Sequence, residues 1–552
     1  ICRYYPYGAL LSQVLGLTTV DSEGQSGLES RYEDVLRGTE GSYLRQVDAR
    51  NRQLDGTEGW YIPSQQGCGL VLTIDAEIQE MVEKAMRECI EVNQAQSVIC
   101  LVSDVKTGAI LAMCMNPCYD PNDPPRNDAE TLTELMRLTA ISDVYEPGST
   151  FKILTAASAL DSGVTTPQDS FYCSAKITVD GDTIRCWGRP HGAETMADGL
   201  KNSCNPVFVE LALRMGTDTF YRYLTAFGLG KKTGIDLPGE SPGILITSRN
   251  VKRVDLARIG FGQSVALTPI QMIMAANSVI NGGKLMKPYI VSEIQTPDGE
   301  TLEHFHPTVM AAPIRPETSD TMRLLLERVV SEGGGKNAAI AGYRIGGKTG
   351  TAQVYKNGRV VRDTHIGSFY GFAPVNDPQV SILVIVKEAD VPIDYGGTTA
   401  APFARQIMQE MLPYLGIEPE NDEKDEEIEV PALKGLTIGD AKRKLSQVGL
   451  ESVTDGANTV VLDQLPPAGA KLVKGGHVML YTAGSEELTP EELVCVPDLT
   501  GLGDVDCARL VRQRGLMMSM TGQGLCTEQS PAAGEYVQPG TTIFLLMAGD
   551  DE

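Results

Sequence analysis

The sequence has little of what defines a membrane-spanning, nucleic-acid-binding or disulfide-rich protein. No apolar run in its 552 residues reaches the ~18 residues that a membrane-spanning helix needs. Its 47 lysines and arginines stand against 72 aspartates and glutamates, and the net charge of −25 repels phosphate backbones, so we expect no nucleic-acid partner. Its 12 cysteines are too dilute for a disulfide scaffold, and no pair has C-x-x-C spacing.

Metal ligands at short spacing are also missing. The five histidines form no H-E-x-x-H or H-x-x-x-H pattern, and Cys114 and Cys118 have no second pair of ligands nearby in the sequence. The sequence therefore predicts no metal site and no cofactor. What it does contain is an ordinary globular composition, with 42% apolar and 22% charged residues, and a length that suggests three or four domains at about 150 residues each.

The C-terminal part contains an internal repeat. Val-Pro-Ala-Leu-Lys-Gly-Leu at 430–436 recurs as Val-Pro-Asp-Leu-Thr-Gly-Leu at 496–502. In each copy a helical segment precedes an alternating strand, so we predict two small α+β domains, at 430–484 and 494–550. Acidic segments with little to bury, at 418–429 and 485–493, are the predicted linkers.

Ahead of the first linker, we predict a multi-domain α/β organisation. Amphipathic helical segments such as 76–92 accompany apolar strands such as 98–105 and 380–387, which indicates a mixed α/β domain over 67–417. Residues 1–66 are interpreted as the final part of a separate domain that starts before this sequence.

The first candidate for chemistry is Ser149-Thr150-Phe151-Lys152, which follows a Pro-Gly turn and opens a helical run. Ser149 and Lys152 then share one helical face, where a buried lysine can lose its proton and activate the serine. The helix N-terminus would stabilise developing negative charge. The alternative is a plain helix start with a capping serine and a solvated lysine, and S-x-x-K arises by chance about twice in a chain of this length.

The second candidate is a Ser-x-Asn motif, which occurs twice. Ser203-Cys204-Asn205 precedes a strongly periodic helix, so its hydroxyl and amide could relay a proton and hold a substrate carbonyl. Ser248-Arg249-Asn250 lies among basic residues and is typical of a helix cap. We therefore favour the first.

Lys-Thr-Gly occurs three times, and only the last copy has the context of a site. The copies at 106–108 and 232–234 are interpreted as a hairpin turn and a loop. Glycines precede the third, and Asn357-Gly358 follows it as a hairpin signal, which places on a strand the residues Lys348, Thr349, Gly350 and Thr351. Lys348 and Thr349 would attract a substrate carboxylate, and the Thr351 N–H could face an oxyanion.

The same segment fits a rival pattern. Residues 342–349 match G-x-x-x-x-G-K-T, the phosphate loop of nucleotide hydrolases. That loop needs an apolar strand before it and a helix after it, whereas here a glycine-rich stretch precedes and a predicted hairpin follows. The nucleotide interpretation fails on this context.

Together, S-x-x-K, S-x-N and K-T-G-T are the motif set of penicillin-binding proteins and serine β-lactamases. The chain resembles the class B penicillin-binding proteins, the monofunctional D,D-transpeptidases of peptidoglycan synthesis, over nearly its whole length. Arg3-x-Tyr5-Pro6-x-Gly8 resembles their N-terminal pedestal (dimerisation-type) domain, Gly260-Phe-Gly-Gln263 resembles their transpeptidase domain, and the repeats resemble PASTA domains. The resemblance implies helices packed around an antiparallel sheet in 67–417.

The resemblance also implies roles. Ser149 would attack the D-Ala–D-Ala carbonyl of a stem peptide, and Lys152 would take its proton. Ser203 and Asn205 would assist proton transfer and position the substrate. The terminal carboxylate would be bound by Lys348, Thr349, Gly350 and Thr351. β-Lactams would acylate the same serine, a partner glycosyltransferase would supply glycan strands, and an N-terminal anchor outside this sequence would hold the catalytic domain on the extracytoplasmic side of the cell membrane.

Two details resemble the sporulation-specific members of the family: the segment Asn202-Ser-Cys-Asn-Pro-Val-Phe208, and Cys173 and Cys186 on either side of an Asp180-Gly181 hairpin. A hairpin would bring the two cysteines close, so a reversible disulfide beside the cleft is one interpretation and two unpaired thiols the other. Division enzymes also carry paired PASTA domains, so division and sporulation both stay open.

Two other functional classes remain. One is a β-lactamase, carboxypeptidase or β-lactam receptor of the same fold, which the missing Glu-x-x-Leu-Asn segment downstream of Ser203 disfavours. The other is a non-enzymatic scaffold whose PASTA repeats bind wall peptides, which the complete motif set argues against. For the repeats themselves, docking and muropeptide binding remain equally open.

Overall fold

The computed structural model describes residues 3–44, 60–188, 190–356, 359–419, 427–454, 460–473, 476–483, 494–522, 524–537 and 540–548. Contacts divide the chain into two compact units. The first comprises residues 1–90 and 95–422 and contains every candidate catalytic residue. The second, comprising 91–94 and 423–552, contains the two repeats.

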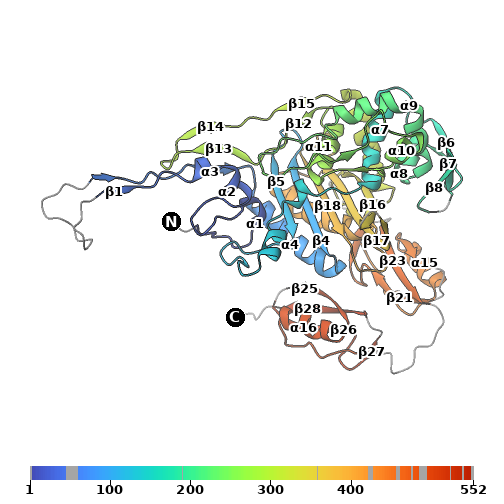
Figure 1. Ribbon diagram of the computed structural model, residues 1–552. Helices are drawn as coiled ribbons and strands as arrows, with labels where there is room; N and C mark the ends of the chain where they lie inside the picture. Colours follow the sequence, from blue (N-terminus) through green and yellow to red (C-terminus); the bar gives the residue numbers. More distant parts are fainter. Residues whose placement is uncertain are drawn as a thin grey trace. The chain divides into compact units, whose positions relative to one another are not determined.

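The first unit is built on a five-stranded antiparallel sheet in the order β16-β17-β18-β4-β5 (Figure 1). Its strands are β4 (Ser97–Asp104), β5 (Ile110–Asn116), β16 (Gly346–Lys356), β17 (Arg359–Ala373) and β18 (Val380–Lys387). The two strands predicted at 98–105 and 380–387 are therefore confirmed to within one residue. Strand β16, which carries the third motif, lies at the edge of the sheet.

Helices cover both faces of this sheet. In β4, Ile99 and Leu101 pack in one apolar cluster with helix α11 (Pro269–Ile280), whereas Cys100 and Val102 pack in another with α4 (Ala76–Asn93) and α14 (Ala401–Tyr414). Because both faces are buried, the strand is a continuous apolar run instead of an alternating one. The predicted arrangement of helices around an antiparallel sheet is confirmed.

A second layer of helices, turquoise to yellow-green in Figure 1, packs on the α11 side of the sheet. It includes η1 (Gly148–Phe151), α7 (Lys152–Asp161), α8 (Met196–Lys201), α9 (Asn205–Ala226), α10 (Arg253–Ile259) and α12 (Pro316–Ser331). Four short strands flank α9: β6 (Ser170–Cys173), β7 (Lys176–Val179), β8 (Asp182–Arg185) and β9 (Gly192–Thr195). Strands β7 and β8 form the predicted hairpin around Asp180-Gly181.

The N-terminal segment packs against the other elements of the first unit. Leu11, Val14 and Leu28 belong to the same apolar cluster as α7 and α9. Gln13 Nε2 also donates a hydrogen bond to the Met115 carbonyl of β5 (3.0 Å). The elements here are α1 (Ser12–Leu15), α2 (Gly27–Arg31), α3 (Glu33–Leu36), β1 (Ser42–Leu44), β2 (Trp60–Ile62) and β3 (Gly69–Leu72), with β3 paired to β13 (Val291–Gln295) and β13 to β14 (Thr301–His304).

The two repeats have the same topology, as their sequences predict. The first contains α15 (Ile438–Gln447), β20 (Glu451–Thr454), β21 (Val460–Leu465) and β23 (His477–Ala483), and the second contains α16 (Asp504–Gln513), β25 (Met517–Gly522), β26 (Leu525–Ser530) and β28 (Thr542–Ala548). Their sheets have the orders β20-β23-β21 and β25-β28-β26, and shorter strands pair beside them: β24 (Val494–Cys495) with β27 (Tyr536–Val537).

One predicted boundary differs. Strand β19 (Glu427–Glu429) pairs with β22 (Lys471–Val473), so the last three residues of the predicted linker belong to the first repeat. The predicted boundary is late by three residues because the charged side chains of β19 are typical of a linker, whereas its backbone pairs as a strand. The rest of that linker from 420 to 426, and the linker at 485–493, lie outside the described residues.

The remaining elements of the first unit are short: α5 (Ala129–Leu135), α6 (Thr139–Ser142), β10 (Ile244–Leu245), β11 (Val265–Ala266), β12 (Leu285–Met286), β15 (Val309–Ala311), η2 (Lys336–Ala338) and α13 (Gly396–Thr399). Within the described ranges, no helix combines the length and the apolar character that crossing a bilayer requires.

Candidate active site

Ser149 lies in the turn η1, directly before helix α7, and is partly exposed. Gly148 precedes it with φ 53°, and a Cβ on that glycine would lie 2.6 Å from the Thr351 carbonyl oxygen. Only glycine combines this left-handed backbone with such a close approach to another chain segment. The turn that contains Ser149 is therefore packed directly against strand β16. Both elements, the Pro-Gly turn and the strand at Lys348, were predicted from the sequence.

Lys152 begins α7 and is fully buried. Its Nζ donates hydrogen bonds to Asn205 Oδ1 (2.7 Å), to the Ser203 carbonyl (2.6 Å) and to Ser203 Oγ (3.2 Å). Burial lowers the pKa of Lys152 to about 7, although nearby acidic groups, Cys186 first, act in the opposite direction. An amine with a pKa near neutrality can accept a proton from a serine at physiological pH.

Ser203 and Asn205 lie where α8 ends and α9 begins. Ser203 has φ 55°, a left-handed conformation that is uncommon for a residue with a Cβ and that occurs most often at functional sites. Asn205 Nδ2 donates to the Arg185 carbonyl (3.0 Å), so both polar ends of its side chain are held. The predicted position of this motif, on a loop over a rigid helix, is confirmed.

Lys348 in β16 is also fully buried and completes the cluster. Its Nζ donates to Ser203 Oγ (3.0 Å) and to the Thr349 carbonyl (3.1 Å). Burial, with a smaller contribution from the like charge of Lys152, lowers the pKa of Lys348 well below its usual value. The Ser203 hydroxyl thus contacts both amines, and the three predicted motifs meet at one place.

Thr349 and Thr351 lie on the opposite face of β16 from Lys348 and Gly350, because side chains alternate along a strand. Both threonines are partly exposed, and Thr351 Oγ1 accepts a hydrogen bond from the Gly396 N–H (3.3 Å) in α13. A Cβ on Gly350 would lie 2.9 Å from Thr150 Cγ2. Glycine at this position therefore lets the strand approach the nucleophile turn closely.

The motif copies that were rejected lie elsewhere. Lys106-Thr107-Gly108 forms the turn between β4 and β5, as predicted. Ser248-Arg249-Asn250 forms a turn and caps no helix: α10 begins at Arg253, and its N-cap is Lys252. The rival phosphate loop is excluded because its Gly-Lys-Thr lies inside strand β16. Asn357-Gly358 falls outside the described residues.

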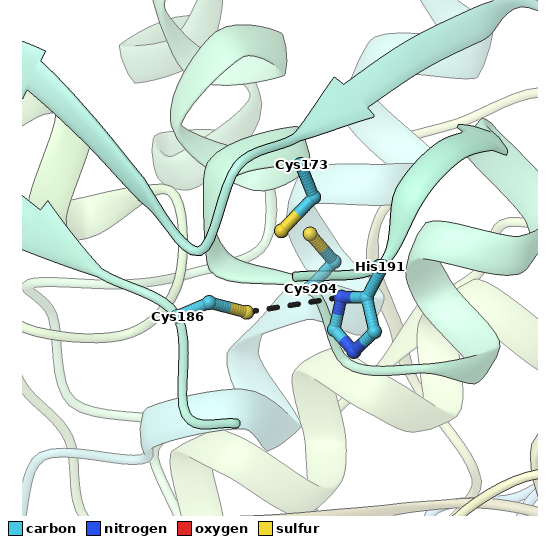
Figure 2. Close-up of side chains that lie close together, drawn as sticks. All are labelled: Cys173, Cys186, His191 and Cys204. Atoms are coloured by element: carbon cyan, nitrogen blue, oxygen red, sulfur yellow. Dashed lines mark hydrogen bonds between the residues drawn. The ribbon is translucent and has the colours of Figure 1, made fainter. Parts of the chain in front are cut away.

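Cys173 and Cys186 both have free thiols, and the fold brings two further residues to them, His191 and Cys204 (Figure 2). The Cys204 thiol hydrogen-bonds to Cys186; this lowers the pKa of Cys186 and raises that of Cys204. The sequence analysis missed His191, although it lies only five residues after Cys186, because the pair matches none of the ligand patterns considered. Cys204 was the sequence feature that could have indicated such a group, because it is a third cysteine and lies inside the S-x-N motif.

Three family models match the chain. The penicillin binding protein transpeptidase domain matches residues 98–409, the penicillin-binding protein dimerisation domain matches residues 1–72, and the PASTA domain matches residues 428–484 and 494–549. Stage V sporulation protein D of Bacillus subtilis (strain 168) is 38% identical over 496 residues, which cover 88% of this chain and 76% of that protein. Peptidoglycan D,D-transpeptidase FtsI of Escherichia coli (strain K12) is 31% identical over 421 residues, covering 76% and 68%.

Solved structures are also similar. Penicillin binding protein 3 from Mycobacterium tuberculosis, in a crystal structure with aztreonam, matches with a TM-score of 0.68 and 28% identity, covering 76% of this chain and 91% of that chain. Penicillin binding protein 2X from Streptococcus thermophilus matches with a TM-score of 0.67, covering 99% of this chain and 83% of that one. At 21% identity, the second match shows the fold alone.

Proposed function

The chain belongs to the penicillin-binding protein transpeptidase family, and on that premise we propose that Ser149 is its nucleophile. The protein is a serine-type peptidoglycan D,D-transpeptidase that penicillin acylates. The observation that carries the assignment of Ser149 is the buried Lys152 amine, one turn away, which contacts both polar residues of the S-x-N motif.

Acylation begins when Ser149 Oγ attacks the carbonyl carbon of the penultimate D-alanine of a stem peptide. The serine proton passes to the neutral Nζ of Lys152 as the Oγ–C bond forms. The oxyanion is stabilised by the backbone N–H groups of Ser149 and Thr351, and losing one such donor typically costs ~10²–10³ in rate.

The tetrahedral intermediate collapses by breaking the C–N bond to the terminal D-alanine. The leaving amine takes back the proton from Lys152, and Ser203 Oγ, which contacts both lysines, supplies the path. In the second half-reaction an amine of another stem peptide attacks the ester, its proton returns to Ser149, and the new peptide bond forms the cross-link.

Residues of strand β16 orient the donor peptide. Thr349 and Thr351 offer partly exposed hydroxyls for the terminal carboxylate of the donor peptide, while Lys348 on the opposite face holds the Ser203 hydroxyl beside the strand. Gly350 keeps the approach between the strand and the nucleophile turn clear.

We also propose the cellular setting. Cross-linking needs glycan strands, so the protein works with a partner glycosyltransferase. Because its substrate lies outside the cytoplasm, it acts at the extracytoplasmic side of the cell membrane. An N-terminal anchor holds it there. The similarity to a stage V sporulation protein supports a role in sporulation, with division as the alternative.

A fluorescent penicillin tests the assignment of the nucleophile. We expect label that persists for minutes on the wild type and is absent from Ser149→Ala. Ser162→Ala is a matched control, because Ser162 lies at the other end of α7 and bonds only within that helix (Oγ to the Ala159 carbonyl, 3.1 Å). Equal labelling of Ser149→Ala, or no label on folded wild type, would contradict the proposal.

A further inference from the structure

Four side chains with metal-binding atoms converge beside the Ser203–Asn205 loop (Figure 2). Their ligand atoms all lie within 4.8 Å of one another. They come from four separate segments, at the end of β6, after β8, before β9 and at the N-cap of α9: Cys173, Cys186, His191 and Cys204. We propose that this group, the Cys₃His cluster, binds one Zn²⁺ ion.

The spacing of the cluster is close to what zinc needs. Tetrahedral zinc, with Zn–S of about 2.3 Å and Zn–N of about 2.0 Å, places neighbouring ligand atoms roughly 3.5–3.8 Å apart. Cys186 Sγ and His191 Nδ1 are already 3.9 Å apart. The other ligand pairs need to close by about 1 Å at most, which short connections between two-stranded pairs can absorb.

Burial makes the cluster a closed site. Cys173 and Cys204 are fully buried, and Cys186 is 9% exposed. Three buried thiols alone would fit an ordinary apolar core, since cysteine packs there as a small hydrophobic residue. An imidazole nitrogen directed at those sulfurs does not fit such a core.

Glu194 gives a further indication of a cation. It is 8% exposed; its Oε2 accepts a hydrogen bond from Asn202 Nδ2 (3.1 Å), and its only other donor among the described residues is the weakly donating Cys204 thiol. Its Oε1 lies 3.7 Å from His191 Nδ1, at the rim of the cluster. A thiol compensates a buried carboxylate poorly, and a divalent cation beside it would balance its charge.

The types of ligand atom in the cluster favour zinc. Thiolates and an imidazole are typical ligands of zinc, whereas magnesium and calcium bind oxygen. Four protein ligands also leave no open position, so the ion would be structural instead of acting on the substrate. The sequence predicted no metal site because its search was confined to ligands close together in the chain.

The ion would hold the S-x-N loop in place. Cys204 lies between Ser203 and Asn205, and Asn205 is bonded to the carbonyl of Arg185, the residue before Cys186. Zinc would thus tie the residue directly after the left-handed Ser203 to the segments between β6 and β9. We infer that the cluster is a positioning element for the Ser203 hydroxyl.

Metal content of the full chain tests the site. The reduced protein, equilibrated with zinc chloride and desalted, is expected to retain about one zinc per chain, and cobalt in its place should give the thiolate charge-transfer absorption of a tetrahedral site. Cys173→Ser and His191→Gln should each lose most of the bound metal. Cys100→Ser is the control, because Cys100 is equally buried but lies in β4, outside the cluster.

Several results would overturn the proposal. One is reduced, folded wild type that takes up neither zinc nor cobalt; another is Cys173→Ser with full metal content. A disulfide between Cys173 and Cys186 that forms in the purified chain, with no metal uptake after its reduction, would do the same. The positioning role fails separately if removing zinc with a chelator leaves the rate of penicillin acylation unchanged; we expect the rate to fall and to recover when zinc is restored.

Discussion

At the scale of single residues, Lys152 is where burial has the clearest chemical effect. Among the described residues its amine has no carboxylate partner within hydrogen-bond distance, and its contacts are a carbonyl, a hydroxyl and an amide oxygen. A neutral amine can donate its two N–H bonds to the carbonyl and the amide oxygen and accept from the Ser203 hydroxyl through its lone pair, while burial penalises the charged form. The surroundings of Lys152 therefore favour its neutral form, which can act as a base, over a charged form held in an ion pair.

This predicts the pH dependence of acylation. Since the pKa of Lys152 is lowered to about 7, the second-order rate of penicillin acylation should rise roughly tenfold per pH unit below that value and level off above it. Stopped-flow measurement over about pH 5 to 9 gives the profile. Lys152→Arg, which stays protonated, should be slower by about 10²–10⁴ and should lack this inflection. An unchanged inflection in that variant would assign the titration to another group.

The sequence predicted these residues because their motifs are local. Ser149 and Lys152 are three positions apart, and Ser203 and Asn205 are two apart, so spacing alone suggested their use. It could not predict that one hydroxyl, Ser203 Oγ, contacts both lysines, since that depends on how a loop meets a strand. Glu194 was missed for the same reason: its burial beside the cysteine and histidine side chains is visible only after folding.

At the scale of elements, the contact between turn η1 and strand β16 positions the nucleophile. Gly148→Ala would add a Cβ 2.6 Å from a backbone oxygen of β16, at a residue with φ 53°. We expect a loss of stability of about 1–3 kcal/mol and a slower acylation, because the turn must move away from the strand.

Gly163→Ala is the control for that substitution. Gly163 has φ 73°, but a Cβ there would meet nothing within 4 Å. Gly163→Ala should lower the free energy of unfolding by about 1 kcal/mol and leave the acylation rate unchanged, since alanine disfavours the left-handed backbone but meets no neighbouring atom. Thermal unfolding and labelling rates measure both variants, and equal effects on acylation would show that the contact with β16 has no role.

In each repeat, a glutamine side chain holds the first loop against the sheet; Gln464 is buried, and Gln529 is partly exposed. Gln464 Oε1 accepts from the Leu433 N–H (2.7 Å), and Nε2 donates to the carbonyls of Pro431 and Pro466. The corresponding residue of the second repeat, Gln529, makes the equivalent three bonds. Each glutamine lies two residues before a proline, in Gln464-Leu-Pro466 and Gln529-Ser-Pro531, and the same set of contacts recurs in both copies.

Gln464→Ala should therefore destabilise the first repeat. It leaves the buried Leu433 N–H without an acceptor, which typically costs about 1–3 kcal/mol. Hydrogen exchange at Leu433 should accelerate by about tenfold to a hundredfold. Gln447→Ala, at the exposed end of α15, should leave that exchange unchanged. Equal protection of Leu433 in both variants would contradict the assigned role.

Element positions were predictable where periodicity was strong. Strands β4 and β18 and helix α4 match their predicted ranges, because long apolar or amphipathic runs define them. Strand β19 was not predictable, since Glu427–Glu429 has the charge of a linker, and its backbone pairing and the packing of Ile428 on the repeat core appear only in the fold. The N-terminal segment, predicted as the end of a separate domain, shares an apolar cluster with the catalytic elements through Leu11 and Val14, a contact that its sequence alone does not reveal.

At the scale of the whole molecule, the site depends on the fold of the first unit. Ser149, Ser203 and Lys348 come from a turn, a loop and a strand that are distant in sequence, and every proposed catalytic contact lies inside that unit. The repeats form the other unit and have their own apolar cores, around Leu433 and Leu499. The chain therefore separates the chemistry from whatever the repeats bind.

The most direct test of the account is the product formed from peptidoglycan strands that carry pentapeptide stems. With such strands and the wild-type chain, mass spectrometry of the digested product should find stem peptides joined in pairs, with one D-alanine released for each join. Ser149→Ala should give neither. Stems shortened by one D-alanine without cross-links would identify a carboxypeptidase, and intact stems in the presence of folded, penicillin-labelled protein would contradict transpeptidation altogether.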